Sequence, residues 1–186
     1  MPKVAVFVGS LRQQSVNRAF AQALAKLAAP KLDFVFSELG DIPHFNQDQE
    51  KAPPPAVQRL KREIDAADAV LFVTPEYNRS FSASLKTVLE WGSRPWGENQ
   101  WPGMPAAIVG ASPGAIGTAV AQAQLRSVVT HLGMPLLAQP EVYIQFKPEL
   151  IGENGEIAPE STRKFLGQWV DAFAHWIERN NSAAAA

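Results

Sequence analysis

The sequence contains no cysteine among its 186 residues. This absence excludes disulfide bonds, a catalytic thiolate and iron–sulfur ligation by cysteine, so redox chemistry would have to come from a bound cofactor. The histidines are His44, His131 and His175, and their positions do not have the spacing of metal ligands. The sequence therefore predicts no metal site.

The sequence also lacks a strong net charge and a long apolar segment. The formal net charge is −1, so no overall field favours nucleic acid or an anionic membrane. No window predicts a membrane span, and the apolar run at the N-terminus is shorter than the core of a signal peptide. We therefore expect a soluble, cytoplasmic protein that binds neither nucleic acid nor membrane.

Hydrophobic residues make up 46% of the chain and charged residues 19%, which is typical of a globular domain. The length suits one well-buried domain and is short for two. We expect a single domain over residues 1–182, followed by a disordered alanine-rich tail at 183–186.

Strand-like and helix-like segments alternate along the chain. Apolar runs predict strands at residues 4–8, 32–36, 69–73, 106–111 and 141–145. Helices are predicted between them and after the last, where Phe165, Trp169, Phe173 and Trp176 follow a helical spacing typical of a core-facing side. Near-continuous apolar strands that alternate with helices predict an α/β fold, with a parallel sheet covered on both faces.

Three polar loops follow predicted strands, at residues 9–15, 74–81 and 112–117. In parallel sheets, ligands bind beyond the carboxyl ends of the strands, where the strand order reverses. All three loops carry Gly, Ser or Asn, so their backbones can approach a ligand closely. A fourth segment, 41–45, lies in a proline-rich loop and is interpreted as covering either a site or a partner.

The first loop has the features of an anion site. Gly9 ends a buried strand, Ser15 is placed to cap a helix, and Ser10 adds a hydroxyl. Arg12 and Arg18 offer fixed positive charge that suits a phosphate. The loop matches neither a dinucleotide fingerprint nor a nucleotide-triphosphate loop, so a monophosphate fits better. These residues taken alone are equally consistent with a sharp turn flanked by surface arginines.

Three stretches together resemble the NADPH-dependent FMN reductase family, specifically its quinone and chromate reductase members. They are Gly9-Ser10-Leu11-Arg12 with Ser15 and Asn17, Pro75-Glu76-Tyr77-Asn78 with Ser80, and Ser112-Pro113-Gly114-x-x-Gly117. Leu85-Lys86 and Trp91-x-Ser93-Arg94 also resemble the helix that follows the second stretch in the family. The resemblance implies a flavodoxin-like, doubly wound fold of five parallel strands in the order 2-1-3-4-5, with helices on both faces.

The resemblance also implies FMN as the cofactor and NADPH or NADH as the electron donor. The residues that would hold the FMN phosphate are Ser10, Arg12, Ser15 and Asn17. Those that would lie along the isoalloxazine ring, mostly through backbone groups, are Pro75, Glu76, Tyr77 and Asn78. The third loop would contribute Ser112 and Gly114 near the ring, with Gly117 beside them.

The chain departs from the family pattern at two places. Ser82-Ala83-Ser84 stands where members usually have Pro with a small residue, and because Pro stiffens the first helical turn, we expect a looser loop. Ser112-Pro113 replaces a hydroxyl-rich version, which leaves the ring contacts of the third loop open.

No catalytic side chain is predicted, because the cofactor carries the electrons in hydride transfer. Backbone N–H groups near helix N-termini would stabilise charge on the reduced flavin. Glu76 resembles a general acid, but loop carboxylates are more often solvated or capping. Lys86 and Arg94 are candidate contacts for the phosphate of NADPH or for an anionic acceptor. The alternative is a solvated helix face and a surface ion pair.

Trp91, Trp96 and Trp101 lie in a segment rich in Trp, Pro and Gly. They suit either a wall of the acceptor pocket or a subunit contact, since aromatic residues are enriched in interface cores. The resemblance implies a homodimer or homotetramer, so we favour the subunit contact.

The leading hypothesis is an enzyme that passes electrons from NAD(P)H through FMN to a small-molecule acceptor, with quinones ahead of azo dyes, ferric chelates and chromate. The alternative is an FMN-binding electron carrier that serves a partner protein. The enzyme is favoured because the phosphate loop of flavodoxins and their strong acidity are both absent. A module without flavin is a third hypothesis. Its receiver-domain version fails, because Gly9-Ser10 and Thr74-Pro75 occupy the positions that would need acidic residues.

Overall fold

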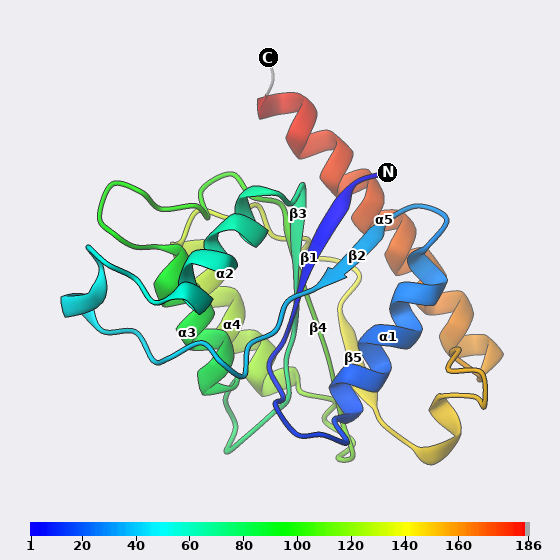
Figure 1. Cartoon of the computed structure of the whole chain (residues 1–186). Coiled ribbons are helices and arrows are strands. Elements are labelled where there is room, and N and C mark those ends of the chain that lie inside the picture. The colour runs from blue at the N-terminus through cyan, green and yellow to red at the C-terminus, as the bar shows by residue number, and fades with distance from the viewer. Residues whose placement is uncertain (185–186) are drawn as a thin grey trace.

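The computed structural model describes residues 1–184 as a parallel sheet between two layers of helices (Figure 1). The five strands have the order β2-β1-β3-β4-β5, which confirms the predicted topology. They are β1 (Lys3–Val8), β2 (Asp33–Phe36), β3 (Ala69–Val73), β4 (Ala106–Ser112) and β5 (Val142–Gln145). Every neighbouring pair is parallel, so the carboxyl ends of all the strands meet at one edge, the lower edge in Figure 1.

The helices are α1 (Val16–Ala28), α2 (Pro55–Asp65), α3 (Ala83–Gly92), α4 (Ala119–His131) and α5 (Glu160–Ala184), with short 3-10 turns η1 (Gln47–Gln49) and η2 (Pro148–Leu150). Successive strand residues point to opposite faces. Val4 and Val6 therefore pack with α1 and α5, while Ala5 and Phe7 pack with α2, α3 and α4. The predicted helical layers on both faces are confirmed.

The last helix packs as its aromatic spacing predicts. Trp169 and Phe173 are buried, and Phe165 and Trp176 are partly buried against the same core. At the end of α4, Gly133 takes a φ of 76°, the left-handed conformation that stops a helix.

Two of the tryptophans assigned to a subunit contact belong to the core of the chain instead. Trp91 and Trp101 are 1% and 0% exposed, and their indole N–H groups donate to the backbone oxygens of Pro43 and Leu89, each at 2.9 Å. The prediction is wrong for these two because α3 and the loop after it close over a buried aromatic cluster. Trp96, by contrast, is 88% exposed.

Within residues 1–184, none of the helices is both long enough and apolar enough to cross a membrane. Residues 183 and 184 of the predicted tail belong to α5. Residues 185 and 186 lie outside the described part of the chain.

Candidate functional site

The loop after β1 is anchored to the neighbouring strand and to α3. The Gly9 N–H donates to the Val73 carbonyl at 2.9 Å, and the Ser84 hydroxyl donates to the Gly9 carbonyl at 2.7 Å. A Cβ atom on Gly9 would lie 2.4 Å from the hydroxyl oxygen of Ser82, so this close approach requires glycine. The first predicted loop is therefore fixed against the start of α3.

Hydrogen bonds hold the start of α3, where the family pattern has proline. Ser82 is the N-cap, and its hydroxyl accepts from the Leu85 N–H at 3.4 Å. The Ser82 and Ser84 hydroxyls are 3.0 Å apart, and Ser84 continues to the first loop. Where a proline ring would stiffen this turn in the family pattern, hydrogen bonds from the two serines hold the start of α3 against the first loop.

The first loop leaves its backbone donors free. The N–H groups of residues 10–15 form no hydrogen bond within the described chain. Ser15 caps α1 by accepting from the Arg18 N–H at 3.2 Å, and Arg12 is exposed and forms no ion pair with residues 1–184. Free N–H groups, a helix N-terminus and an uncommitted guanidinium together fit a monophosphate.

Asn17 ties α1 to β4 with its buried side chain. Its amide N–H donates to the Ala111 carbonyl and its amide oxygen accepts from the Ala111 N–H, both at 2.9 Å. The last strand-to-strand contact on that side is the Thr74 N–H to the Val109 carbonyl. β3 has therefore ended where Ala111 needs a partner, and Asn17 takes the place of the missing strand. A direct phosphate contact from Asn17 stays a prediction.

The second loop contains a tight turn beside the first. Tyr77 and Ser80 exchange backbone hydrogen bonds of 3.0 and 2.9 Å, with Asn78 and Arg79 at φ values of 51° and 66°. Two positive φ values in succession are typical of a type I′ turn, which Asn tolerates better than Arg. The Tyr77 hydroxyl is 3.3 Å from the Ser10 hydroxyl oxygen, so the two predicted loops touch.

Glu76 caps the N-terminus of α4. Its side chain is 6% exposed, and one carboxylate oxygen accepts from the N–H groups of Val120 and Ala121, each at 3.1 Å. The N-cap position itself, Thr118, makes no side-chain capping bond. The other carboxylate oxygen accepts from the Arg79 guanidinium at 3.0 Å. Of the two interpretations of Glu76, the capping one is confirmed.

We expect the Glu76→Ala variant to lose about 1.5–3 kcal/mol of unfolding free energy, because it removes a charged acceptor from two helix N–H groups. Urea unfolding measures this loss. Glu76→Gln is the control, since its amide oxygen can still accept from both helix N–H groups while the charge is lost, so its loss should be smaller. Equal stability of the wild type and Glu76→Ala would contradict the capping role.

The third loop is closed on itself. The Ser112 hydroxyl donates to the Gly114 carbonyl at 3.0 Å, and Gly114 is exposed. Gly117 has a φ of 57°, and a Cβ there would lie 2.6 Å from the Tyr143 backbone, so the loop packs tightly on β5. Ring contacts from Ser112 and Gly114 stay predictions.

A cleft of about 470 Å³ opens between the first two loops. It brings Arg12 and Tyr77 together with residues 82–84 and Thr87 at the start of α3. Its third wall is the segment 39–44, including Leu39, Ile42 and His44, while Ser112 and Gly114 are absent from its lining. The sequence predicted that segment 41–45 covers either a site or a partner. It contains no motif from which Leu39 or the hydroxyls of α3 could be placed in the wall of the cleft.

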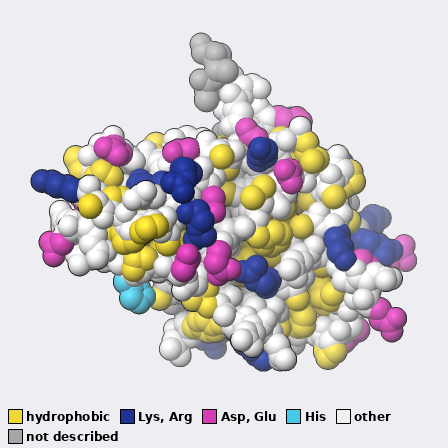
Figure 2. Space-filling view, in the orientation of Figure 1, with side chains coloured by type: hydrophobic (Ala, Val, Ile, Leu, Met, Phe, Trp, Pro, Cys, Tyr) yellow, Lys and Arg dark blue, Asp and Glu magenta, His cyan; other side chains and the backbone are white. Residues whose placement is uncertain are grey.

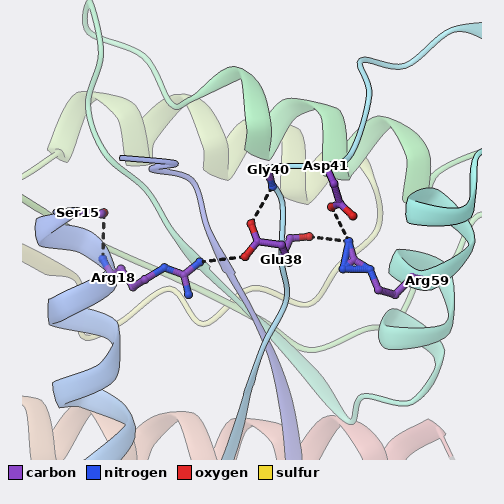
Figure 3. Close-up of polar contacts among 6 residues, drawn as sticks. All are labelled: Ser15, Arg18, Glu38, Gly40, Asp41 and Arg59. Carbon is purple, nitrogen blue, oxygen red and sulfur yellow. Dashed lines mark hydrogen bonds and ion pairs between the residues drawn. The ribbon is translucent and has the colours of Figure 1, made fainter. Parts of the chain in front are cut away.

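An ion-pair chain holds this third wall in place (Figure 3). Glu38 accepts from the Gly40 N–H at 3.0 Å and lies 3.9 Å from the Arg18 guanidinium on α1. Arg59 on α2 donates to the Glu38 carbonyl and pairs with Asp41, both at 2.8 Å. The segment is therefore fixed between α1 and α2 at the carboxyl edge of the sheet.

Lys86 and Arg94 each form an ion pair within the chain, as the alternative to a phosphate or acceptor contact predicts. Lys86 pairs with Glu90 one turn along α3. Arg94 is 3.5 Å from Glu50, and its guanidinium lies over the rings of Phe45 and Trp96 at 5.7 and 5.9 Å. Neither residue lines the cleft, so contacts with donor or acceptor stay predictions.

Two side chains with a shifted pKa lie away from this cleft. Burial lowers the pKa of Lys61 on α2, and the nearby Glu98 and Asp65 oppose the shift. Partial burial raises the pKa of Tyr143 on β5, and a hydrogen bond with Glu141 raises it further. Neither side chain is among the residues that line the cleft, so neither is placed to exchange protons with a ligand there.

Comparison with known proteins gives consistent results. The family model described as NADPH-dependent FMN reductase matches residues 2–149. A 2-hydroxy-1,4-benzoquinone reductase from a Burkholderia species is 47% identical over 175 residues, which cover 94% of this chain and 96% of the relative. A quinone reductase from Pseudomonas putida is 46% identical over 180 residues, covering 96% of both.

A solved structure matches over nearly the whole chain. It is FerB, a flavoenzyme NAD(P)H:(acceptor) oxidoreductase from Paracoccus denitrificans. The TM-score is 0.94 at 46% sequence identity, and the match covers 97% of this chain and 99% of that one.

Proposed function

This chain belongs to the NADPH-dependent FMN reductase family, and on that premise we propose that it reduces quinones with electrons from NAD(P)H. It is an oxidoreductase that uses FMN as cofactor and NAD(P)H as electron donor. The observation that carries the proposal is the first loop, which has free N–H groups and contributes Leu11 and Arg12 to the lining of the 470 Å³ cleft.

In this proposal the first loop holds the FMN phosphate. The backbone N–H groups of residues 10–15 and the α1 N-terminus are the donors, and Arg12 supplies the neutralising charge. Ser10 and Ser15 belong to the same loop, and each is nearly buried, at 5% exposed. Asn17 contributes by fixing α1 on β4, which keeps these donors in one orientation.

When bound, FMN supplies the redox chemistry by taking a hydride from NAD(P)H and giving electrons to the acceptor. The chain supports the ring through residues 75–78. Pro75 is buried and its carbonyl accepts from the Thr74 hydroxyl at 2.7 Å, while Glu76 fixes the turn on α4. These ties hold the turn backbone rigid, so its groups need little reorganisation as charge develops.

A quinone fits the chemistry of the cleft. Leu11, Leu39 and Ile42 give it apolar walls, and His44 and Tyr77 place polar groups among them. Small-molecule sites in proteins combine mainly apolar walls with a few placed polar groups, as a flat ring with carbonyl oxygens requires. Chromate, azo dyes and ferric chelates are secondary acceptors in the proposal.

An anaerobic spectroscopic titration tests the enzyme against the electron-carrier alternative. We expect NADPH to bleach the visible absorbance of the FMN-loaded protein within the turnover time, and 1,4-benzoquinone to restore it. A bound flavin that stays oxidised with both NADPH and NADH would favour the carrier. Failure to bind FMN after reconstitution would exclude both. Running the titration with NADH and NADPH in parallel sets the donor preference.

The proposal includes a homodimer or homotetramer, supported by the exposed indole of Trp96. Sedimentation of the purified protein, with Trp96→Ser beside the wild type, tests it, and a monomer at all concentrations would contradict it. A cytoplasmic location belongs to the proposal as well, since NAD(P)H is generated inside the cell.

A further inference from the structure

A second hollow, of about 240 Å³, lies over β1 and β2 beside α2. Figure 2 shows it near the middle of the view, with a hydrophobic floor and with Lys and Arg side chains over α2 at its side. It shares no lining residue with the flavin cleft. We call this hollow the β2 groove.

The β2 groove exists because small side chains face a short edge strand. β2 has four residues, and its Val35 pairs in register with Ala5 of β1. Beyond the C-terminus of α2 the facing residues are Ala66 and Ala67, which are too short to cover that pair. Val35 is left 46% exposed as part of an apolar floor.

The rim of the groove carries uncommitted positive charge. Within residues 1–184, neither the Lys3 ammonium nor the Arg62 guanidinium forms a hydrogen bond or an ion pair. The third cation of the rim, Arg59, is already bound to the Glu38 carbonyl and to Asp41. Two free cations beside an apolar floor complement a ligand with an apolar body and an anionic group.

The wall of the groove also holds an unsatisfied acceptor. One carboxylate oxygen of Glu63, Oε2, is buried and has no hydrogen-bond partner in the described chain. The other oxygen lies 3.8 Å from the Arg59 Nε. A buried acceptor without a donor is unfavourable, so a hydroxyl that reached Oε2 would be stabilised there.

From these features we infer that the β2 groove binds a small aromatic carboxylate that carries a ring hydroxyl. The ring lies on the floor formed by Ala5 and Val35, the carboxylate is held by Lys3 and Arg62, and the hydroxyl donates to Glu63. The volume suits a single ring and is too small for a nucleotide. The inference does not depend on the identity of the electron acceptor, because the two sites are separate.

The test is an amide chemical-shift titration of the FMN-loaded, nitrogen-15-labelled protein with 4-hydroxybenzoate. We expect saturable shifts at Ala5, Val35 and Ala66. Benzoate and 4-hydroxybenzyl alcohol each lack one of the two polar groups, so each should bind about tenfold more weakly. Shifts confined to residues 9–15 and 74–82, or no saturable shift at all, would overturn the inference.

Variants localise the binding. Arg62→Gln should weaken 4-hydroxybenzoate about tenfold, through loss of one charge-assisted contact. Arg163→Gln removes the same charge from an exposed position on α5, over the opposite face of the sheet, and should leave the affinity unchanged. Val35→Trp fills the groove from a half-exposed position that tolerates bulk, and should abolish the shifts. If Arg62→Gln and Arg163→Gln weakened 4-hydroxybenzoate binding equally, the effect would come from the net charge of the protein, and the proposed site would be contradicted.

Discussion

Replacing Arg12 by Ala is expected to weaken FMN binding by about ten- to a hundredfold. The guanidinium forms no ion pair within residues 1–184, so in the proposed site its charge is free for the phosphate. Loss of a hydrogen bond to a charged group amounts to about 1.5–3 kcal/mol, which corresponds to that change in affinity. Quenching of flavin fluorescence during titration of the apoprotein measures the dissociation constant.

The Arg12→Lys variant should fall between Ala and the wild type, because an ammonium keeps the charge but loses the bidentate geometry. Stability of the apoprotein should change little in both variants, since Arg12 is exposed. Arg163→Gln controls for net charge and should bind FMN normally. An unchanged affinity in Arg12→Ala would refute the phosphate assignment.

Replacing Asn17 by Leu is expected to lower the free energy of unfolding by about 2–5 kcal/mol. The change leaves the N–H and carbonyl of Ala111 buried without partners, and each such group costs about 1–3 kcal/mol. Leu has nearly the same size, so the loss reports hydrogen bonding rather than a cavity. Denaturant unfolding, with the slope checked against the wild type, gives the value.

Asn180 is the matched control. Its amide also donates to a backbone carbonyl, that of Trp176, but at a partly buried position on α5 where water can replace the bond. Asn180→Leu should therefore change stability by less than about 0.5 kcal/mol. A similarly small loss for Asn17→Leu would show that the tie between α1 and β4 does not support the fold.

The topology could be predicted because the strands are apolar on both faces. β3 is buried at every residue, which only a central strand of a covered parallel sheet requires. The positions of the first two loops at one edge follow from the same topology, because parallel strands align their carboxyl ends. The hydroxyls of Ser10 and Tyr77 are 3.3 Å apart, so the first two loops are in contact.

Other features of the site depend on contacts between residues far apart in the sequence, which no local sequence pattern reveals. The segment 39–44 is placed by ion pairs from two helices, and the partners Arg18 and Arg59 are 41 positions apart in the chain. Trp91 and Trp101 are of a residue type that is enriched in interface cores, yet α3 and the loop after it bury both in the core of the chain. The partners of Glu76 and Asn17 are likewise far along the chain, so the sequence alone predicted a ligand role for Asn17 and left open whether the Glu76 carboxylate is a general acid or a solvated or capping group.

The cap that Glu76 provides has an electrostatic consequence for the whole carboxyl edge of the sheet. The helices α1, α3 and α4 begin at this edge directly after the three predicted loops, and each presents the positive end of its dipole there. A carboxylate neutralises α4, and the Ser82 hydroxyl satisfies the first turn of α3. At α1, a neutral hydroxyl caps one N–H while the donors of the preceding loop remain open. Of these three helix N-termini, the one at α1 is therefore left most able to attract a dianion, and this fixes where the charged end of an elongated ligand binds.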